Sequence, residues 1–141
     1  MPAITLEPIR PDEFHRYSDW FNESASDFLS GAPESLASNF GDAAESLAWK
    51  LVLGNETLAL VTISVDYSNI GKLNLVVDPR VRRRGVGSAA IKLVIARPEV
   101  QSLRGLVGEV SASNIGARKI FIKNGFAKAG YTQKGNLEFR R

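Results

Sequence analysis

The segment between residues 75 and 96 constrains the fold of this chain more than any other. An apolar run, Leu75-Val76-Val77, is typical of a strand, and residues 88–96 carry apolar side chains at helical spacing. The connection between them reads DPRVRRRGVG, with four arginines and two glycines separated by one residue. Such glycines leave main-chain N–H groups uncovered at the positive end of a helix dipole, and nearby guanidinium groups favour phosphate. The segment therefore predicts a strand, a loop that binds several phosphates, and a helix.

One alternative interpretation of this glycine loop is excluded and two stay open. A nucleoside-triphosphate loop carries Lys and Ser or Thr after its second glycine, whereas Gly87 is followed by Ser88-Ala89, so nucleotide hydrolysis is excluded. The dinucleotide-binding pattern is matched from Gly85 onward, with Glu109 at a suitable distance, but seven residues separate that glycine from the strand. A third interpretation is a basic helix start without a ligand, or a nucleic-acid surface. The aromatic residues that accompany basic ones at nucleic-acid sites are missing here, so we expect no nucleic-acid partner.

Composition excludes several kinds of chemistry. The chain has no cysteine and one histidine, His15, which excludes disulfides, thiolate nucleophiles, zinc fingers and sites with several histidines. We therefore expect no metal. The first 70 residues carry three basic and eleven acidic side chains, whereas the last 71 carry fifteen and four. The basic half suits phosphates and the acidic half suits a cationic partner, although two solvated faces would give the same counts.

Hydrophobic patterning predicts an α/β fold of the mixed α+β type. Residues 47–53 and 57–65 are two apolar runs around Gly54-Asn55, which predicts a hairpin. Further strands are expected at residues 4–9, 72–77, 106–110, 126–132 and 136–140, and helices at residues 12–21, 88–96 and 114–124. Antiparallel strands early and two strand–helix units late favour a mixed, mostly antiparallel sheet flanked by helices over a doubly wound parallel sheet.

The length of 141 residues predicts a single domain, residues 1–141. Between residues 23 and 46 the composition shifts to Ser, Ala, Gly, Asp and Glu, which predicts a partly helical lid. The apolar runs fall far short of the ~20 residues of a membrane helix, and the acidic first 14 residues do not resemble a signal peptide. We expect a soluble cytoplasmic protein without a membrane partner. The oligomeric state stays open, a homodimer included.

Two motifs resemble those of the GNAT superfamily of acyl-CoA-dependent N-acetyltransferases. Residues 82–87 are similar to the family's Arg/Gln-x-x-Gly-x-Gly/Ala signature, and Val77-Asp78-Pro79 precedes them as is usual. Residues 114–126 are similar to the family segment Asn-x-x-Ala-x-x-Leu-Tyr-x-Lys-x-Gly-Phe. The resemblance covers residues 73–126, the acyl-CoA-binding core, whereas residues 1–46 match only in the order of elements. It implies a sheet whose two central parallel strands splay apart around acyl-CoA.

The resemblance also implies which residues bind the co-substrate, acetyl-CoA. The first parallel strand would contact the pantetheine and the acyl carbonyl through the main chain of Leu75, Val76 and Val77. The pyrophosphate and the 3′-phosphate would be held by Arg82, Arg83, Arg84, Gly85, Val86, Gly87 and Ser88. Substituting Gly85 or Gly87 is then expected to weaken binding and leave the fold intact. Asn114 would reach the pantetheine or the sulfur, although a plain helix N-cap explains it equally well.

Glu109 is the candidate general base. An amine must lose a proton before it attacks a thioester, and Glu109 is an acidic residue within an otherwise apolar strand, where it is expected to be partly buried. Its segment, Glu109-Val110-x-Ala112-Ser113-Asn114, resembles the same strand of bacterial N-terminal acetyltransferases that modify ribosomal proteins, in which this glutamate is the base. The alternative is a surface glutamate paired with a neighbouring cation.

The sequence departs from the family at Phe121, where the usual tyrosine protonates the departing thiolate. Its loss is expected to slow the reaction by about 10²-fold, because a thiolate is a tolerable leaving group. Water or a hydroxyl of Ser88, Tyr67 or Tyr131 could replace it. The expected function is direct acetyl transfer, without a covalent intermediate, to a peptide N-terminus, a lysine or a small cationic amine. The alternative is a non-catalytic acyl-CoA-binding or regulatory module of the same fold.

Overall fold

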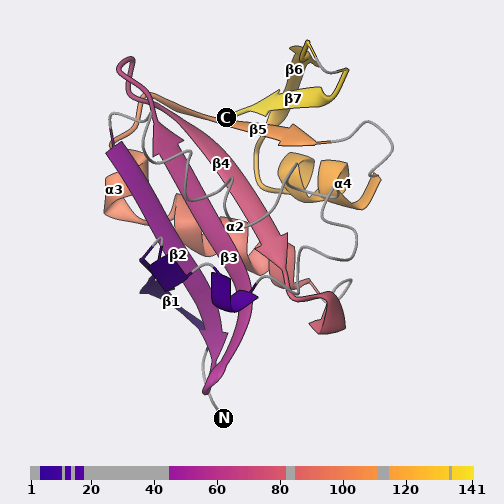
Figure 1. Ribbon diagram of the computed structural model, residues 1–141. Helices are drawn as coiled ribbons and strands as arrows, with labels where there is room; N and C mark the ends of the chain where they lie inside the picture. Colours follow the sequence, from indigo (N-terminus) through magenta and orange to yellow (C-terminus); the bar gives the residue numbers. More distant parts are fainter. Residues whose placement is uncertain are drawn as a thin grey trace.

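The computed structural model spans residues 1–141 and describes residues 4–10, 12–13, 15–17, 45–81, 85–110, 115–133 and 135–141. Within them a seven-stranded sheet runs in the order β1-β2-β3-β4-β5-β7-β6 (Figure 1). Its strands are β1 (Ile4–Pro8), β2 (Glu45–Leu53), β3 (Glu56–Val65), β4 (Ile70–Val77), β5 (Gly105–Val110), β6 (Ala127–Tyr131) and β7 (Leu137–Arg140). The helices are α2 (Val86–Ile95), α3 (Pro98–Gln101) and α4 (Ile115–Lys123), with a 3-10 helix at Pro79–Val81.

The hairpin predicted around Gly54-Asn55 forms the centre of one half of the sheet. β2 and β3 pair antiparallel along their length, and Gly54 supplies the left-handed backbone of the turn, at φ +63°. β1 pairs with β2 and β4 with β3, both antiparallel. Three consecutive antiparallel pairs therefore lead the chain into β4.

β4 and β5 form the parallel pair of the described sheet, and α2 and α3 make the crossover between them. The ladder between the two strands ends at Leu73 and Gly108. β4 nevertheless continues to Val77 and β5 to Val110, and the two ribbons diverge in Figure 1. β5 then pairs antiparallel with β7, and β7 with β6. The structure confirms a mixed, mostly antiparallel sheet whose central parallel strands splay apart.

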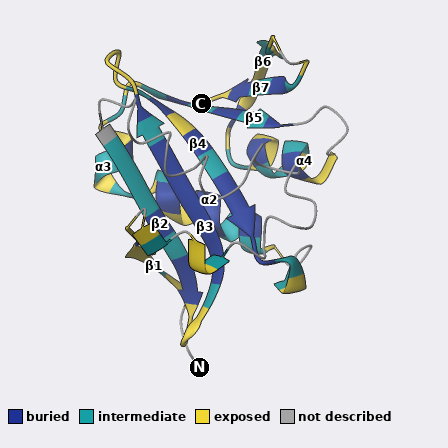
Figure 2. Cartoon of the chain, viewed as in Figure 1, coloured by how far each residue is buried: buried dark blue, intermediate teal, exposed yellow. Residues whose placement is uncertain are grey.

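α2 covers one face of the sheet and closes the core. Its buried residues Ala90, Ile91 and Val94 share one helix face, and α2 packs on β3 and β4. The strands contribute buried side chains such as Val61 and Leu75. β3 and β4 are mostly dark blue, the colour of buried residues, in Figure 2. Burial of each large apolar side chain stabilises the fold by about 1.5–3 kcal/mol. This packing fixes β4 against α2 at the place where β5 diverges from it.

Several boundaries differ from those that the sequence predicts. β2 begins at Glu45, so residues 45–46 belong to a strand, and the rest of the predicted lid lies outside the described residues. Residues 12–13 and 15–17 form 3-10 turns where the pattern predicts a longer helix. Pro98 ends α2, as expected, but it also occupies the first turn of α3, a position that suits proline. Within the described part of the chain, no helix is long and apolar enough to cross a membrane.

Candidate functional site

The candidate site lies where β4 and β5 separate. Leu73 and Gly108 are the last residues in register, and both face the helix side, where the Phe121 ring packs on Gly108. Because side chains alternate along a strand, the next residues, Asn74 and Glu109, lie on the opposite face. Both are partly buried. The splay therefore has an aromatic ring on one face and a carboxamide and a carboxylate on the other.

The strand residues assigned to the pantetheine continue from this point. Leu75, Val76 and Val77 are 1%, 3% and 4% exposed. They stay in register with β3, whereas no residue of β4 beyond Leu73 is in register with β5. A Cβ placed on Gly87 would lie 3.3 Å from Leu75 Cδ2 and 3.6 Å from Val77 Cγ2. The structure thus brings the end of β4 and the start of α2 together, as the loop motif requires.

Gly85 and Gly87 have different parts in this arrangement. Gly85 precedes α2 with φ +78°, a left-handed backbone that strains other residues, and a Cβ there would meet nothing within 4 Å. Gly87 is buried, and a Cβ there would lie 3.2 Å from Ile120 Cδ1 and 3.3 Å from Leu75 Cδ2. Gly87→Val would require the Ile120 and Leu75 side chains to shift by a few tenths of an ångström, and Gly85→Ala would put a side chain on a left-handed backbone, so the expectation that both substitutions leave the fold intact stays a prediction.

Two parts of the expected coenzyme site, Arg82–Arg84 and Asn114, lie outside the described residues, so their assignment stays a prediction. Ser88, on the first turn of α2, is described. Its hydroxyl accepts a hydrogen bond of 3.2 Å from Nδ2 of Asn124, which follows α4. The same Nδ2 donates to the main-chain oxygen of Ile120 at 2.8 Å. These bonds hold the start of α2 against the end of α4.

Asp78 and Arg80 form an ion pair after β4 that the sequence pattern does not reveal. Asp78 is 2% exposed. Arg80 donates from Nη2 to Oδ2 at 2.8 Å, and from Nε to Oδ1 at 3.2 Å and Oδ2 at 3.1 Å. These hydrogen bonds, and then the charge of Asp78, raise the pKa of the Arg80 guanidinium above its ordinary value. Arg80 thus stabilises the end of β4. Its role therefore differs from the one assigned to the other three arginines, which is to bind phosphate.

Glu109 is interpreted either as a general base or as a surface glutamate paired with a cation, and its surroundings have features of both. Its side chain is 23% exposed, and Oε2 accepts a hydrogen bond of 2.8 Å from Asn136 Nδ2. Its other oxygen, Oε1, lies 3.9 Å from Nζ of Lys72, whose side chain is 57% exposed. Glu138 stands opposite Glu109 on β7 and accepts a bond of 2.7 Å from Arg140 Nε. Glu109 is therefore partly buried, held through one oxygen and faced by a cation at the other.

Asn136 owes its position to the turn between β6 and β7. The Thr132 N–H donates to the Asn136 carbonyl at 2.8 Å, and the Asn136 N–H donates to Thr132 Oγ1 at 3.2 Å. Gly135, at φ +81°, donates its N–H to the Thr132 carbonyl at 2.9 Å. Sequence reasoning missed both Asn136 and Lys72. The signal that could have found Asn136 is the pairing of β7 with β5, which brings the residue before β7 to the end of β5.

Phe121 fills the helix side of the splay. It is 2% exposed, and a Cβ on Gly108 would lie 2.5 Å from its Cε1 and Cζ atoms. Its ring stacks on Phe139 at 5.7 Å between centroids and meets Phe126 edge-on at 4.8 Å. Only glycine at position 108 allows this approach. The ring thus stands at the last β4–β5 pair without a hydroxyl group.

The hydroxyl groups considered as replacements are not equally placed. Tyr67 precedes β4, at the end away from the splay, and is 92% exposed. Tyr131 lies on β6, is 65% exposed, and its hydroxyl accepts a bond of 3.3 Å from Lys128. Ser88 lies on the helix side, at the start of α2. This geometry argues against Tyr67 as the replacement.

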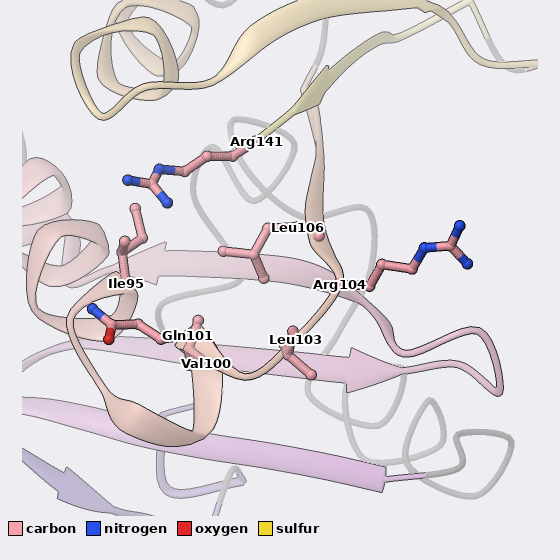
Figure 3. Close-up of a pocket in the computed structure, with 8 residues that line it drawn as sticks. Ile95, Val100, Gln101, Leu103, Arg104, Leu106 and Arg141 are labelled. Carbon is pink, nitrogen blue, oxygen red and sulfur yellow. The ribbon is translucent and has the colours of Figure 1, made fainter.

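A separate hollow lies at the other end of β5. Its volume is about 370 Å³, and its lining consists of Ile95, Val100, Gln101, Leu103, Arg104, Gly105, Leu106 and Arg141 (Figure 3). The guanidinium groups of Arg104 and Arg141 point away from each other in Figure 3. The hollow surrounds the first residues of β5, whereas Glu109 lies near the last. It is therefore not part of the splay.

The sequence matches the Acetyltransferase (GNAT) family over residues 11–126, which is most of the chain. This chain therefore belongs to the GNAT acetyltransferase family. A comparison with curated proteins gave no match.

Solved structures share the fold at low sequence identity. The ribosomal-protein-S18-alanine N-acetyltransferase from Escherichia coli is similar with a TM-score of 0.77 and 21% identity, over 98% of this chain and 92% of that one. The spermidine N-acetyltransferase SpeG N152L mutant from Vibrio cholerae gives 0.76 and 11%, over 98% and 92%. Mycobacterium smegmatis RimJ in complex with CoA-disulfide gives 0.76 and 16%, over 99% and 82%. These similarities show the fold.

Proposed function

We propose that this protein transfers an acetyl group from acetyl-CoA directly to a primary amine. The observation that carries the proposal is the polar face of the splay. Glu109 is the first β5 residue past the last β4–β5 pair, partly buried and hydrogen-bonded to Asn136. Membership of the GNAT acetyltransferase family supports acetyl-CoA as the donor. The absence of cysteine from the sequence favours direct transfer in a ternary complex over a cysteine-bound acyl intermediate.

The coenzyme is proposed to lie between the ends of β4 and α2. Leu75–Val77 would contact the pantetheine, Arg82–Ser88 the phosphates, and Asn114 the pantetheine or the sulfur. Gly85 supports this assignment, because its left-handed backbone opens directly into α2, whose first N–H groups have no partner within the helix. The two segments lie next to each other, since a Cβ added to Gly87 would be 3.3 Å from Leu75 Cδ2. The RimJ structure holds a coenzyme A derivative in a chain of the same fold.

Glu109 is proposed to take the proton from the acceptor ammonium, directly or through one water. The neutral nitrogen then attacks the thioester carbon, the carbon–sulfur bond breaks, and the nitrogen releases its second proton to solvent as the amide forms. The departing thiolate takes up a proton from water or a hydroxyl group, because Phe121 has none to donate. Asn136 supports this role, because it holds Oε2, so that Oε1, with Lys72 Nζ 3.9 Å away, is the oxygen that would take the proton.

The acceptor is proposed to be a cationic primary amine that approaches from the face of Glu109. An acidic first half of the sequence supports a positively charged acceptor. Two of the similar structures are named for acceptors that offer an amine nitrogen, the alanine of ribosomal protein S18 and spermidine. A peptide N-terminus, a lysine and a small polyamine are therefore the first acceptors to test.

Two measurements test the proposal. Calorimetry should detect binding of acetyl-CoA, and a thiol assay should detect CoA release that depends on an amine from the panel above. Glu109→Gln should lower CoA release and leave acetyl-CoA binding unchanged. Glu99→Gln, the same change on α3, is the matched control and should alter neither. Failure to bind acetyl-CoA would reject the proposal.

Phe121 favours a second candidate function, an acyl-CoA-binding or regulatory module without catalysis. The family's proton-donating tyrosine is replaced here by a buried phenylalanine. A module of this kind would bind acetyl-CoA and release no CoA with any amine. The same pair of measurements therefore separates the two functions.

A further inference from the structure

Lys72 brings an amine of the protein itself to the candidate base. Its Nζ lies 3.9 Å from Glu109 Oε1. Lys72 comes just before Leu73, the last β4 residue in register with β5, and Glu109 comes just after Gly108, the last on β5. The lysine side chain thus crosses from the paired end of β4 to the first residue of the splay. Its ammonium group lies at the point where the two strands separate.

The position of this nitrogen matches what a general base requires. A base must reach the nitrogen that it deprotonates at roughly 2.6–3.2 Å, or through one water molecule. Lys72 Nζ is slightly beyond direct reach of Oε1, at 3.9 Å. Asn136 occupies the other oxygen, so Oε1 is the one that faces the lysine. If Glu109 is the base, Lys72 already stands close to where an acceptor nitrogen must stand.

We infer that the protein acetylates itself at Lys72. The inference rests on the proposed function, because it uses the same coenzyme and the same base. Glu109 takes a proton from the ammonium group, and the freed electron pair of Nζ forms a bond to the thioester carbon. The carbon–sulfur bond breaks, the nitrogen loses its second proton as the amide forms, and the thiolate of CoA takes up a proton in turn through water. The products are N-acetyl-Lys72 and free CoA, and no further reactant is needed.

The other lysines in the described part of the chain lack this arrangement. Within the described residues, Lys72 forms an ion pair with a carboxylate and no other lysine does. Lys50 lies on the same face of the sheet but on β2, two strands from β4. Lys92 is exposed on α2, which covers the opposite face. A nitrogen tethered beside the base reacts as if at high concentration, so the reaction should be selective for Lys72.

Acetylation would change the site that it modifies. An amide carries no positive charge, so the ion pair between Lys72 and Glu109 would be lost. Oε1 of Glu109 would then face an incoming cationic acceptor without a competing ammonium. The modified and unmodified proteins should therefore differ in KM for a cationic amine.

The test is incubation of the full chain with isotopically labelled acetyl-CoA and no added amine, followed by peptide mass mapping. We expect label at Lys72 to exceed that at Lys50 and Lys92 by about tenfold or more, at a rate independent of protein concentration. Lys72→Arg keeps the charge and should lose this label while still binding acetyl-CoA. Glu109→Gln should slow labelling by about 10²-fold or more, and Glu99→Gln should not.

Several outcomes would overturn self-acetylation. These are absence of label at Lys72, equal label on all exposed lysines, labelling that Glu109→Gln leaves unchanged, and a rate that rises with protein concentration. A parallel assay with the amine panel separates this failure from that of the proposed function. Turnover of an external amine that depends on Glu109, with Lys72 unlabelled, rejects self-acetylation alone. A protein that neither binds nor consumes acetyl-CoA rejects both.

Discussion

The paired end and the splayed end of β4 and β5 both have a glycine in close contact with a neighbouring side chain, but they differ in the polar groups nearby. At the paired end, a Cβ on Gly71 would lie 2.6 Å from Ile63 Cγ2 and 3.0 Å from Leu103 Cδ1. At the splayed end, Gly108 is equally close to the Phe121 ring, at 2.5 Å. On the opposite face, the splayed end adds Glu109, a carboxylate that accepts a hydrogen bond from Asn136 and lies near Lys72. Close packing therefore holds the strands at both ends, whereas the candidate site lies only at the end of the ladder.

Glu109→Gln, at the splayed end, should lower turnover more than any other change proposed here. Turnover at neutral pH should fall about 10²- to 10⁴-fold, because the amide cannot accept the acceptor's proton. The loss should shrink at alkaline pH, where more of the acceptor amine is already neutral. Steady-state kinetics across this pH range, with Glu99→Gln as the control near the paired end, measure the effect. A loss that is the same at every pH would rule out the role of general base.

Asn136→Asp should have the next largest effect. The change removes the hydrogen-bond donor to Glu109 and places a like charge beside it, so turnover should fall about 10- to 100-fold. The acidic limb of the pH profile should also move to higher pH, while the KM for acetyl-CoA stays the same. Asn55→Asp makes the same chemical change in the exposed turn between β2 and β3. Equal behaviour of the two variants would contradict a positioning role for Asn136.

Gly108→Ala and Gly71→Ala test the two close contacts directly. Each new Cβ forces its neighbours apart, so each variant should lose about 1–3 kcal/mol of unfolding free energy in chemical denaturation. Only Gly108→Ala should also lower acetyl transfer per folded molecule, because it displaces the Phe121 ring at the splay. If both variants lost activity equally, the paired end would have to take part in the reaction.

The smallest effect is expected for the ion pair between Arg97 and Glu99. Arg97 Nε donates to Glu99 Oε1 at 3.0 Å, and this bond lowers the pKa of Glu99 below its ordinary value of 4.5. A lowered pKa stabilises the fold above the ordinary value and ceases to do so as the pH falls through the lowered one. Both side chains are partly exposed, at 42% and 37%, so Glu99→Gln should cost less than about 1 kcal/mol at neutral pH. Urea denaturation should show that this difference disappears in acid.

Local patterns were enough to predict most elements of the sheet. The hairpin of β2 and β3 follows from two apolar runs around Gly54-Asn55, and α2 follows from helical spacing after Gly87. Both predictions depend only on turn residues and hydrophobic spacing within a short segment of the sequence. The exact start of β2 and the presence of α3 were not predictable in this way. Pro98 can end one helix and begin another, and a local pattern does not distinguish the two.

The sequence predicted those residues of the candidate site that stand out within a single segment, and it missed their partners from other segments. Glu109 stands out as a charged residue in an apolar strand, and the structure places it at the splay. Its partners Lys72 and Asn136 come from β4 and from the turn before β7, so the order of strands must be known first. The pairing of Arg80 with Asp78 was missed because four arginines look alike in the sequence.

The sheet consists of two antiparallel halves, β1–β4 and β5–β7–β6, that share one short parallel ladder ending at Leu73 and Gly108. A molecule bound between the diverging strands would contact both halves and link them. Its binding free energy would add to the free energy needed to pull the halves apart. Amide hydrogens in β6 and β7 would then exchange more slowly with solvent, although neither strand is one of the two that diverge.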